Sequence, residues 1–175
     1  MYLRGALDVR ALIGIYLGEG TSMSTKPLHS NKPRPSKVEY FLQMAELVAT
    51  RSTCLHRHQG SVITRDNRVI STGYNGSPPG GVHCTDASCR KVLSLDCRAE
   101  GLHGESNAIA TAARLGIALN GATIYSVFSP CLACCNLILT AGIICVVYRE
   151  IYENYYMGPE YLHEHGIITI EVPTE

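Results

Sequence analysis

Two short groups of residues in this sequence carry side chains that can bind one metal ion. His103 stands at the start of a predicted helix, and Cys131 and Cys134 stand at the start of the next predicted helix. The two cysteines are one helical turn apart, and a helix N-terminus favours the thiolate form that binds metals. Three protein ligands leave zinc one position open to water, as in catalytic rather than structural sites. We therefore expect a catalytic zinc held by these three residues.

Glu105 follows the histidine by two residues and is not needed as a ligand. A carboxylate beside the metal can take a proton from the attacking water and pass it to a ring nitrogen and then to departing ammonia. A lone Cys-x-x-Cys pair is more often structural or redox-active, and a lone His-x-Glu is common by chance. Both motifs in this order, each opening a helix, fit the His-x-Glu and Pro-Cys-x-x-Cys pattern of zinc nucleobase deaminases. Glu105 is the predicted catalytic residue.

The elements that must position these side chains alternate along the chain. Helices and strands are predicted from apolar periodicity, from the Ser36/Glu39 capping pair and from the turn residues between them. The helices are expected over 36–53, 103–115, 130–140 and 161–165, and the strands over 61–64, 68–72, 122–128, 143–148 and 167–172. This order predicts an α/β fold with three layers, α-β-α, around a mixed five-stranded sheet. Residues 1–36 are expected to be an N-terminal extension and linker, either a short helix or disordered, before a domain over 37–175.

Composition narrows the class of protein. The chain has 175 residues, of which 46% are hydrophobic and 17% charged, and its formal net charge is zero. The absence of a basic surplus argues against a nucleic-acid partner bound through its phosphates. No apolar run is long enough to span a membrane. Eight cysteines without a secretory signal favour metal binding in a reducing compartment, so we expect a cytoplasmic protein, or one in the host cytoplasm if it is viral.

Further motifs extend the pattern over nearly all of residues 37–172. They are the runs Arg51-Ser52-Thr53-Cys54, Ser71-Thr72-Gly73-Tyr74-Asn75-Gly76-Ser77-Pro78, Gly81-Val82-His83-Cys84 and Asn107-Ala108-Ile109. With the two zinc motifs, they resemble the deoxycytidylate deaminase family of the cytidine deaminase superfamily. The resemblance implies a cytidine-deaminase-like fold and the zinc-dependent hydrolysis of a free nucleotide, dCMP, to dUMP and ammonia.

The run Gly73-Tyr74-Asn75-Gly76 is similar to a segment that helps bind dCTP or dTTP between subunits in allosteric family members. The resemblance implies a triphosphate effector with Mg²⁺ and a homo-oligomer, hexamer or dimer. It assigns Arg114, at the end of a zinc helix, to subunit contacts or effector coupling. A plain turn is the alternative for the glycine-rich run.

The resemblance also implies a second zinc. Some family members hold one with cysteine and histidine residues from the first helix end and the long loop. The corresponding candidates are Cys54, Cys84, Cys89 and Cys97, with His83 as a possible substitute. Four cysteine ligands would make a closed, structural site. Unliganded thiols are the alternative.

Three positions depart from the family pattern. Gly104 stands where alanine is usual, Gln59 begins Gln59-Gly60-Ser61 in place of Val-Gly-Ala, and Val127 stands where threonine is frequent. Gly104 removes a methyl group near the metal, and Gln59 adds an amide near the base. These changes are expected either to admit a pyrimidine with a C5 substituent, or another base, or to be neutral drift.

The remaining substrate-binding candidates surround the expected nucleotide. Arg57 and His58, with His56, form a basic cluster for the phosphate, although a solvated helix end is an equal alternative. Tyr152 lies where the family often has an aromatic residue over the nucleotide, and Ser129 precedes the cysteine motif. The competing functions are deamination of a C5-modified or triphosphate cytosine nucleotide, deamination of tRNA or single-stranded DNA, and a non-catalytic, zinc-stabilised binding module.

Overall fold

A computed structural model describes residues 34–81, 83–84, 101–152 and 157–174. The chain divides into two units, Met1–Arg34 and Pro35–Glu175. The extension expected over 1–36 therefore lies outside the described residues, apart from 34–36, and it stays a prediction. Among the helices of the described part, none is long and apolar enough to cross a membrane.

The centre of the domain is a mixed five-stranded sheet, as the sequence predicts, and its strands lie in the order β2-β1-β3-β4-β5. Its strands are β1 (Gly60–Arg65), β2 (Arg68–Tyr74), β3 (Thr123–Phe128), β4 (Cys145–Glu150) and β5 (Ile168–Glu171). Strand β1 pairs antiparallel with both β2 and β3, whereas β3, β4 and β5 run parallel. The β1–β2 hairpin turns on Asp66 and Asn67, both in the left-handed backbone region that two-residue hairpin loops require.

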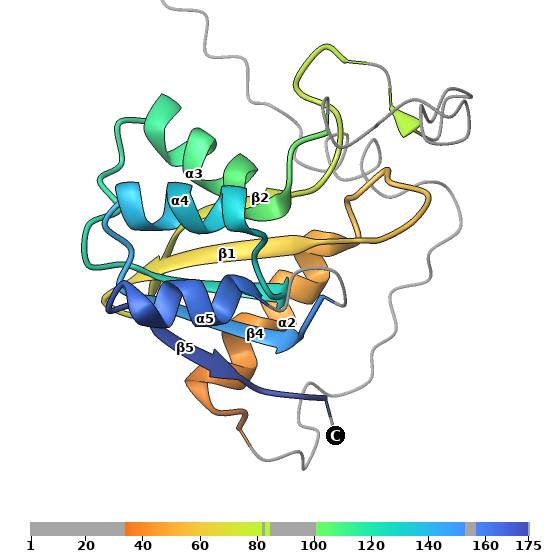
Figure 1. The fold of residues 1–175 in the computed structure, drawn as a ribbon. Helices are drawn as coiled ribbons and strands as arrows, with labels where there is room; N and C mark the ends of the chain where they lie inside the picture. The colour runs from red at the N-terminus through yellow and green to blue at the C-terminus, as the bar shows by residue number, and fades with distance from the viewer. Residues whose placement is uncertain (1–33, 82, 85–100, 153–156, 175) are drawn as a thin grey trace, which may run out of the picture. The chain divides into compact units, whose positions relative to one another are not determined.

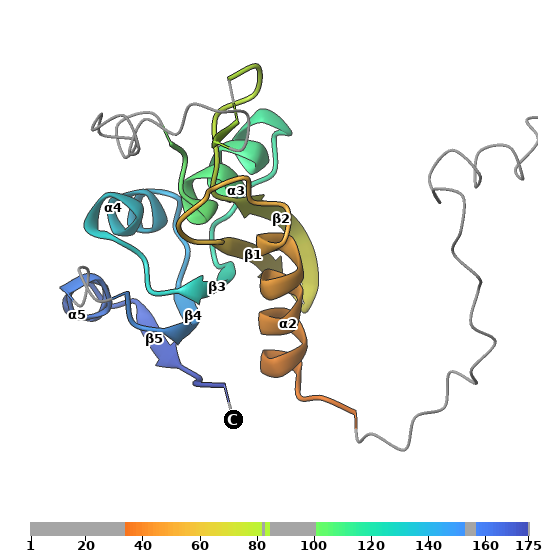
Figure 2. The same cartoon turned by 90° about the vertical axis from the view of Figure 1, so that its right-hand side faces the viewer.

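Helices cover both faces of the sheet and make the three layers that the sequence predicts (Figures 1 and 2). Helix α2 (Lys37–Ala49) lies on one face. Helices α3 (Gly104–Arg114), α4 (Leu132–Thr140) and α5 (Met157–Glu164) lie on the other. The larger core, with the buried residues Ile63, Ile124, Ile138, Ile143 and Leu162, lies between the sheet and these three helices. A smaller cluster of Phe41, Leu42, Tyr125 and Val147 packs beneath α2.

Two helix ends differ from the predicted boundaries. Helix α2 begins as expected, with the Ser36 hydroxyl accepting a hydrogen bond from the Glu39 N–H at 3.1 Å. It ends at Ala49 instead of near Thr53, because the N–H groups of residues 50–52 each bond three residues back and tighten the last turn. Helix α5 begins at Met157, four residues earlier than predicted. Its first turn includes Pro159, which is tolerated there because first-turn N–H groups have no partner within the helix.

Arg149 links α2 to strand β4, a contact that the sequence did not predict. Its guanidinium group donates to both carboxylate oxygens of Glu39, at 2.7 and 2.9 Å, and to Glu46 at 2.7 Å. The Arg149 side chain is 5% exposed, while the two glutamates are 35% and 39% exposed. Hydrogen bonding to Arg149 lowers the pKa of Glu39. A fork of this kind is among the stronger polar contacts in proteins.

Replacing Arg149 with methionine, which keeps the apolar stem, is expected to lower the free energy of unfolding by about 1–3 kcal/mol at pH 7. The folded-state pKa of Glu39 lies below its unfolded value, so this stabilisation is present above the unfolded pKa. It is lost as the pH falls through the folded pKa. Urea unfolding at pH 7 and pH 3 should therefore show a wild-type advantage that shrinks in acid. The exposed Arg68→Met is the control, and an equal loss in both variants would contradict the assignment.

Candidate metal and catalytic centre

The N-termini of α3 and α4 bring the three predicted zinc ligands together. His103 and Cys131 are the N-cap residues of the two helices, and Cys134 lies in the first turn of α4. The His103 Nδ1 atom lies 3.3 Å from the Cys131 sulfur and 3.5 Å from the Cys134 sulfur. Both cysteines are buried. Among the residues that the structure describes, these three form the one cluster of metal-binding side chains, with all ligand atoms within 4.8 Å of each other.

The donor set and its spacing fit a zinc ion. With Zn–S near 2.3 Å and Zn–N near 2.0–2.1 Å, a tetrahedral site places its nitrogen and sulfur ligands about 3.5 Å apart. A hydrogen bond from Cys134 and the nearby His103 lower the pKa of Cys131 well below its usual range. Donation to Cys131, together with burial, raises the pKa of Cys134. The Cys131 thiol therefore readily forms a thiolate, which is the form of cysteine that binds metal ions.

Glu105 lies beside this cluster and is 3% exposed. Its Oε2 atom is 3.8 Å from the Cys134 sulfur, and its Oε1 atom accepts a hydrogen bond of 3.0 Å from the side-chain amide of Gln59. Burial raises the pKa of Glu105. A buried carboxyl group with a raised pKa holds a proton more readily than an exposed one, which suits a group that must take up and later release a proton.

The side chain of Gln59 joins Glu105 to the sheet. Its amide nitrogen also donates to the Ser126 hydroxyl at 2.8 Å, and its amide oxygen accepts from the Phe128 N–H at 3.0 Å. The hydroxyl groups of Ser126 and Ser61 are themselves 2.8 Å apart. Sequence reasoning missed Ser126 and Phe128 as partners of this site. The sequence offered one serine in each of strands β1 and β3, and only the structure shows that both are fully buried.

Gly104 does not leave open space in the site. A methyl group at this position would lie 3.1 Å from Gln59 Cγ, 3.1 Å from Ser61 Oγ and 3.3 Å from the Gln59 carbonyl oxygen. The expectation that Gly104 adds room near the metal is therefore wrong, because Gln59 and Ser61 occupy that volume. The polar atoms of Gln59 are likewise hydrogen-bonded within the chain.

The predicted effector run contacts the site's own scaffold. A side chain on Gly73 would overlap the backbone of α3 at Gly104 and Ala108, so the close packing of β2 against α3 requires glycine here. The Asn75 side chain accepts from the Gln59 N–H at 2.8 Å and donates to the Arg57 carbonyl at 2.9 Å. These bonds fasten residues 57–59 to the end of β2 and so help to place Gln59.

Arg57 and Tyr152, both predicted to bind substrate, lie together. The Arg57 guanidinium carbon is 4.3 Å from the centre of the Tyr152 ring and 5.2 Å from that of Phe128. The Ser129 hydroxyl accepts from the Tyr152 N–H at 2.9 Å and so supports the tyrosine backbone. The structure therefore brings together a cation and two aromatic rings next to the end of β3.

The other predicted residues differ in exposure, and two of them lie outside the described chain. His58 and Arg114 are exposed, and Tyr74 and Gly76 are partly buried, with Gly76 paired to Leu102. Of the second-zinc candidates, Cys54 and Cys84 are partly buried, while Cys89 and Cys97 lie outside the described residues. His83 is exposed, with its Nδ1 atom 3.3 Å from the Thr53 hydroxyl.

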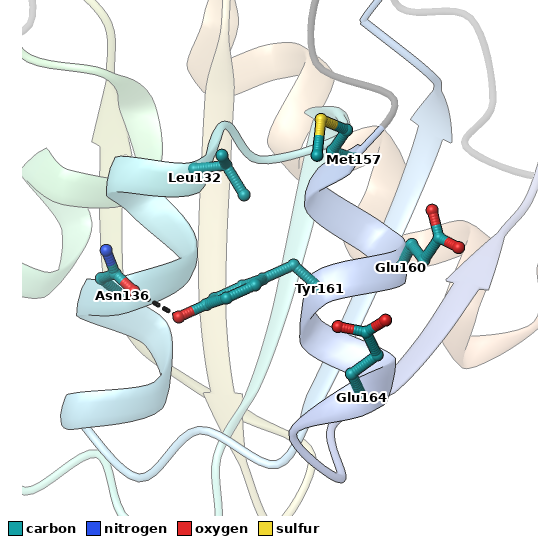
Figure 3. Close-up of a pocket in the computed structure, with 6 residues that line it drawn as sticks. All are labelled: Leu132, Asn136, Met157, Glu160, Tyr161 and Glu164. Carbon is teal, nitrogen blue, oxygen red and sulfur yellow. Dashed lines mark hydrogen bonds between the residues drawn. The ribbon is translucent and has the colours of Figure 1, made fainter.

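A surface pocket between α4 and α5 is separate from the metal cluster (Figure 3). Tyr161 crosses it and donates a hydrogen bond to Asn136 at 2.9 Å. The pocket is lined by Leu132, Asn136, Met157, Glu160, Tyr161 and Glu164. None of these side chains contributes to the histidine–cysteine cluster, so the pocket is not the candidate catalytic site.

Comparison with known proteins finds a matching family model and similar proteins from several organisms. Residues 35–150 match the family model described as the cytidine and deoxycytidylate deaminase zinc-binding region. The chain is 42% identical over 131 residues to deoxycytidylate deaminase of Schizosaccharomyces pombe, covering 71% of this chain. It is 34% identical over 174 residues to deoxycytidylate deaminase of enterobacteria phage T4, covering 78% of this chain.

A comparison with solved structures finds a similar fold in a protein with the same named activity. The crystal structure of dCMP deaminase from cyanophage S-TIM5 in complex with dCMP and dUMP aligns with a TM-score of 0.71 and 25% identity. The alignment covers 81% of this chain and all of that one. The chain spans 40% of the length of the S. pombe protein but 90% of the phage T4 protein. The region matched by the family model, residues 35–150, includes the whole metal and catalytic centre, from Gln59 to Cys134.

Proposed function

The chain belongs to the cytidine and deoxycytidylate deaminase zinc-binding family, and on this premise we propose that it hydrolyses dCMP to dUMP and ammonia. Relatives at 34–42% identity are named deoxycytidylate deaminase, and a structural neighbour was crystallised with dCMP and dUMP. The observation that carries the proposal is the placement of Glu105. A buried carboxylate beside three metal ligands, held by its own hydrogen bonds, serves proton transfer and has no use in a purely structural zinc site.

In this proposal His103, Cys131 and Cys134 hold the zinc ion. When bound, zinc supplies a Lewis acid that makes water a competent nucleophile at neutral pH. Glu105 accepts a proton from the water that attacks C4 of the cytosine ring. It returns that proton to ring nitrogen N3, then takes the proton of the hydroxyl group now on C4 and passes it to the amino group, which leaves as ammonia when the C4–N bond breaks and C4 becomes a carbonyl. The net reaction consumes one water and forms one keto group.

Arg57 is the proposed phosphate ligand, with His58 beside it. The support is that the Arg57 guanidinium group lies against the Tyr152 and Phe128 rings, close to the end of β3 where the cysteine motif begins. An arginine held by aromatic rings is ordered before it meets a phosphate, which reduces the entropy lost on binding. Tyr152 is the proposed cover for the nucleotide, and Ser129 fixes its backbone.

The substrate and the role of Glu105 can be tested together by measuring ammonia release. We expect turnover of dCMP, and slower or no turnover of CMP, dCTP, 5-hydroxymethyl-dCMP and single-stranded DNA. Glu105→Ala is expected to lower kcat on the order of 10²–10⁴-fold or more while zinc stays bound. Glu164→Ala, an exposed carboxylate on α5, is the control and should keep wild-type turnover. Deamination of single-stranded DNA in preference to dCMP would reject the nucleotide assignment, and an active Glu105→Ala would reject the proton-transfer role.

A second, structural zinc at Cys54, Cys84, Cys89 and Cys97, with His83 as a possible substitute, is also proposed, on the resemblance described above. Metal analysis should then find two zinc ions per chain in the wild type. Cys131→Ser and Cys54→Ser should each leave one, because each variant damages a different site. One equivalent or fewer in intact wild-type protein would exclude the second site.

We also propose that the chain forms a homo-oligomer, a hexamer or a dimer, and that dCTP or dTTP with Mg²⁺ regulates it. Gly73-Tyr74-Asn75-Gly76 and Arg114 are the proposed effector residues. The support for this proposal is the similarity of this run to the effector segment of allosteric relatives. Initial rates against dCMP, with each triphosphate and Mg²⁺, should show a shift in apparent affinity of about 5–150-fold. Light scattering should report an oligomer. Hyperbolic kinetics unchanged by either triphosphate would mean that the run serves only as scaffold.

A further inference from the structure

Gln59 and Gly104, two of the three positions expected to depart from the family pattern, are joined physically in the structure, where a methyl group on Gly104 would lie 3.1 Å from Gln59 Cγ. We propose that Gln59 is a positioning residue for Glu105, and that Gly104 is the glycine that makes room for it. The inference rests on the proposed deaminase function and adds a residue on which the orientation of the catalytic carboxylate depends. It assigns both departures to one cause instead of to substrate choice or drift.

The orientation of the Gln59 amide follows from its partners. Its oxygen atom lies 3.0 Å from the Phe128 backbone nitrogen, which can only donate a hydrogen bond. The amide nitrogen must therefore face the other way, toward Glu105 Oε1 at 3.0 Å and Ser126 Oγ at 2.8 Å. Both nitrogen-bound hydrogens and the oxygen are used. Rotating this buried side chain would break all of these bonds at once, so Gln59 is rigidly held.

A rigid Gln59 gives the two oxygens of Glu105 different roles. Oε1 is held by the amide, whereas Oε2 faces the metal cluster, 3.8 Å from the Cys134 sulfur. Oε2 is therefore the oxygen that exchanges protons with the reacting groups. A carboxylate that could rotate freely would spend part of its time with neither oxygen directed at the metal cluster. Misplacement of a catalytic group by about 1 Å can cost on the order of 10²-fold in rate.

Gly104 completes the arrangement because neither neighbour of its missing methyl group can move freely. The nearest atoms, both at 3.1 Å, are Cγ of Gln59 and Oγ of Ser61. The first belongs to the fixed amide, and the second is hydrogen-bonded to Ser126 at 2.8 Å. A methyl group here would displace Gln59 Cγ by a few tenths of an ångström, and the amide nitrogen that bonds Glu105 would be shifted from its present position. With a residue at position 59 that carries no amide, the methyl group would have no amide to displace, although it would still meet Ser61 Oγ.

The test is a set of four variants: Gln59→Met, Gln59→Val, Gly104→Ala and the double variant Gln59→Val/Gly104→Ala. Methionine matches the length of glutamine without its hydrogen bonds, so Gln59→Met should lower kcat about 10- to 100-fold with KM nearly unchanged. Gly104→Ala alone should show the same split between kcat and KM. The double variant should be no slower than Gln59→Val, because the methyl group then meets no amide. Zinc content and the unfolding midpoint report whether each variant is intact.

The measurements use whichever nucleotide the wild type deaminates, so failure of dCMP as the substrate would not affect them. Gln43→Met, an exposed glutamine on α2, is the matched control and should equal the wild type. Three results would overturn the proposal: full kcat in Gln59→Met, a loss that appears in KM instead, or independent, multiplying losses in the double variant. If Gln59→Met does not fold, the comparison of Gly104→Ala with the double variant still decides the question.

Discussion

The catalytic centre depends on keeping one carboxylate, Glu105, almost fully out of water. A buried charge is costly unless hydrogen bonds compensate it, and in the proposed mechanism these bonds must leave free the oxygen that transfers the proton. The chain meets this constraint with an amide from Gln59, itself bonded to Ser126 and Phe128. The buried serines in the strands, the glycine before Glu105 and the loop before β1 can all be understood as consequences.

The mixed sheet makes this compensation possible. Because β1 runs antiparallel to both of its neighbours, its start lies beside the ends of β2 and β3, with Gly60 opposite Tyr74 and Ser61 opposite Ser126. Residue 59 therefore meets the end of β3 and the Asn75 side chain at one edge. The cysteine motif leaves the sheet at this edge, directly after β3. In open α/β sheets ligands gather outside the carboxyl ends of strands, and here an antiparallel neighbour adds a further donor.

Two residues of the run Gly73-Tyr74-Asn75-Gly76 help to build the catalytic scaffold. Gly73 allows β2 to approach α3, and Asn75 fastens the segment that carries Arg57 and Gln59. Both belong to the run that resembles an effector segment. An effector bound there would act on residues already in contact with the catalytic scaffold, which is a physical route for coupling two sites. Arg149 does comparable work on the opposite face, where it ties α2 to the strand next to β3.

The sequence by itself determined the fold class, most element positions and the chemistry of the centre, because apolar periodicity and the spacing of His103, Glu105, Cys131 and Cys134 are local properties. The sequence did not predict that α2 ends at Ala49, that α5 begins at Met157 or that Arg149 is buried, because these features depend on tertiary contacts. Residues 59 and 104 show the limit most clearly. The sequence shows that both residues depart from the family pattern, but they lie 45 positions apart in the chain. The Gln59 side chain comes to lie next to Gly104 only when β1 packs against α3.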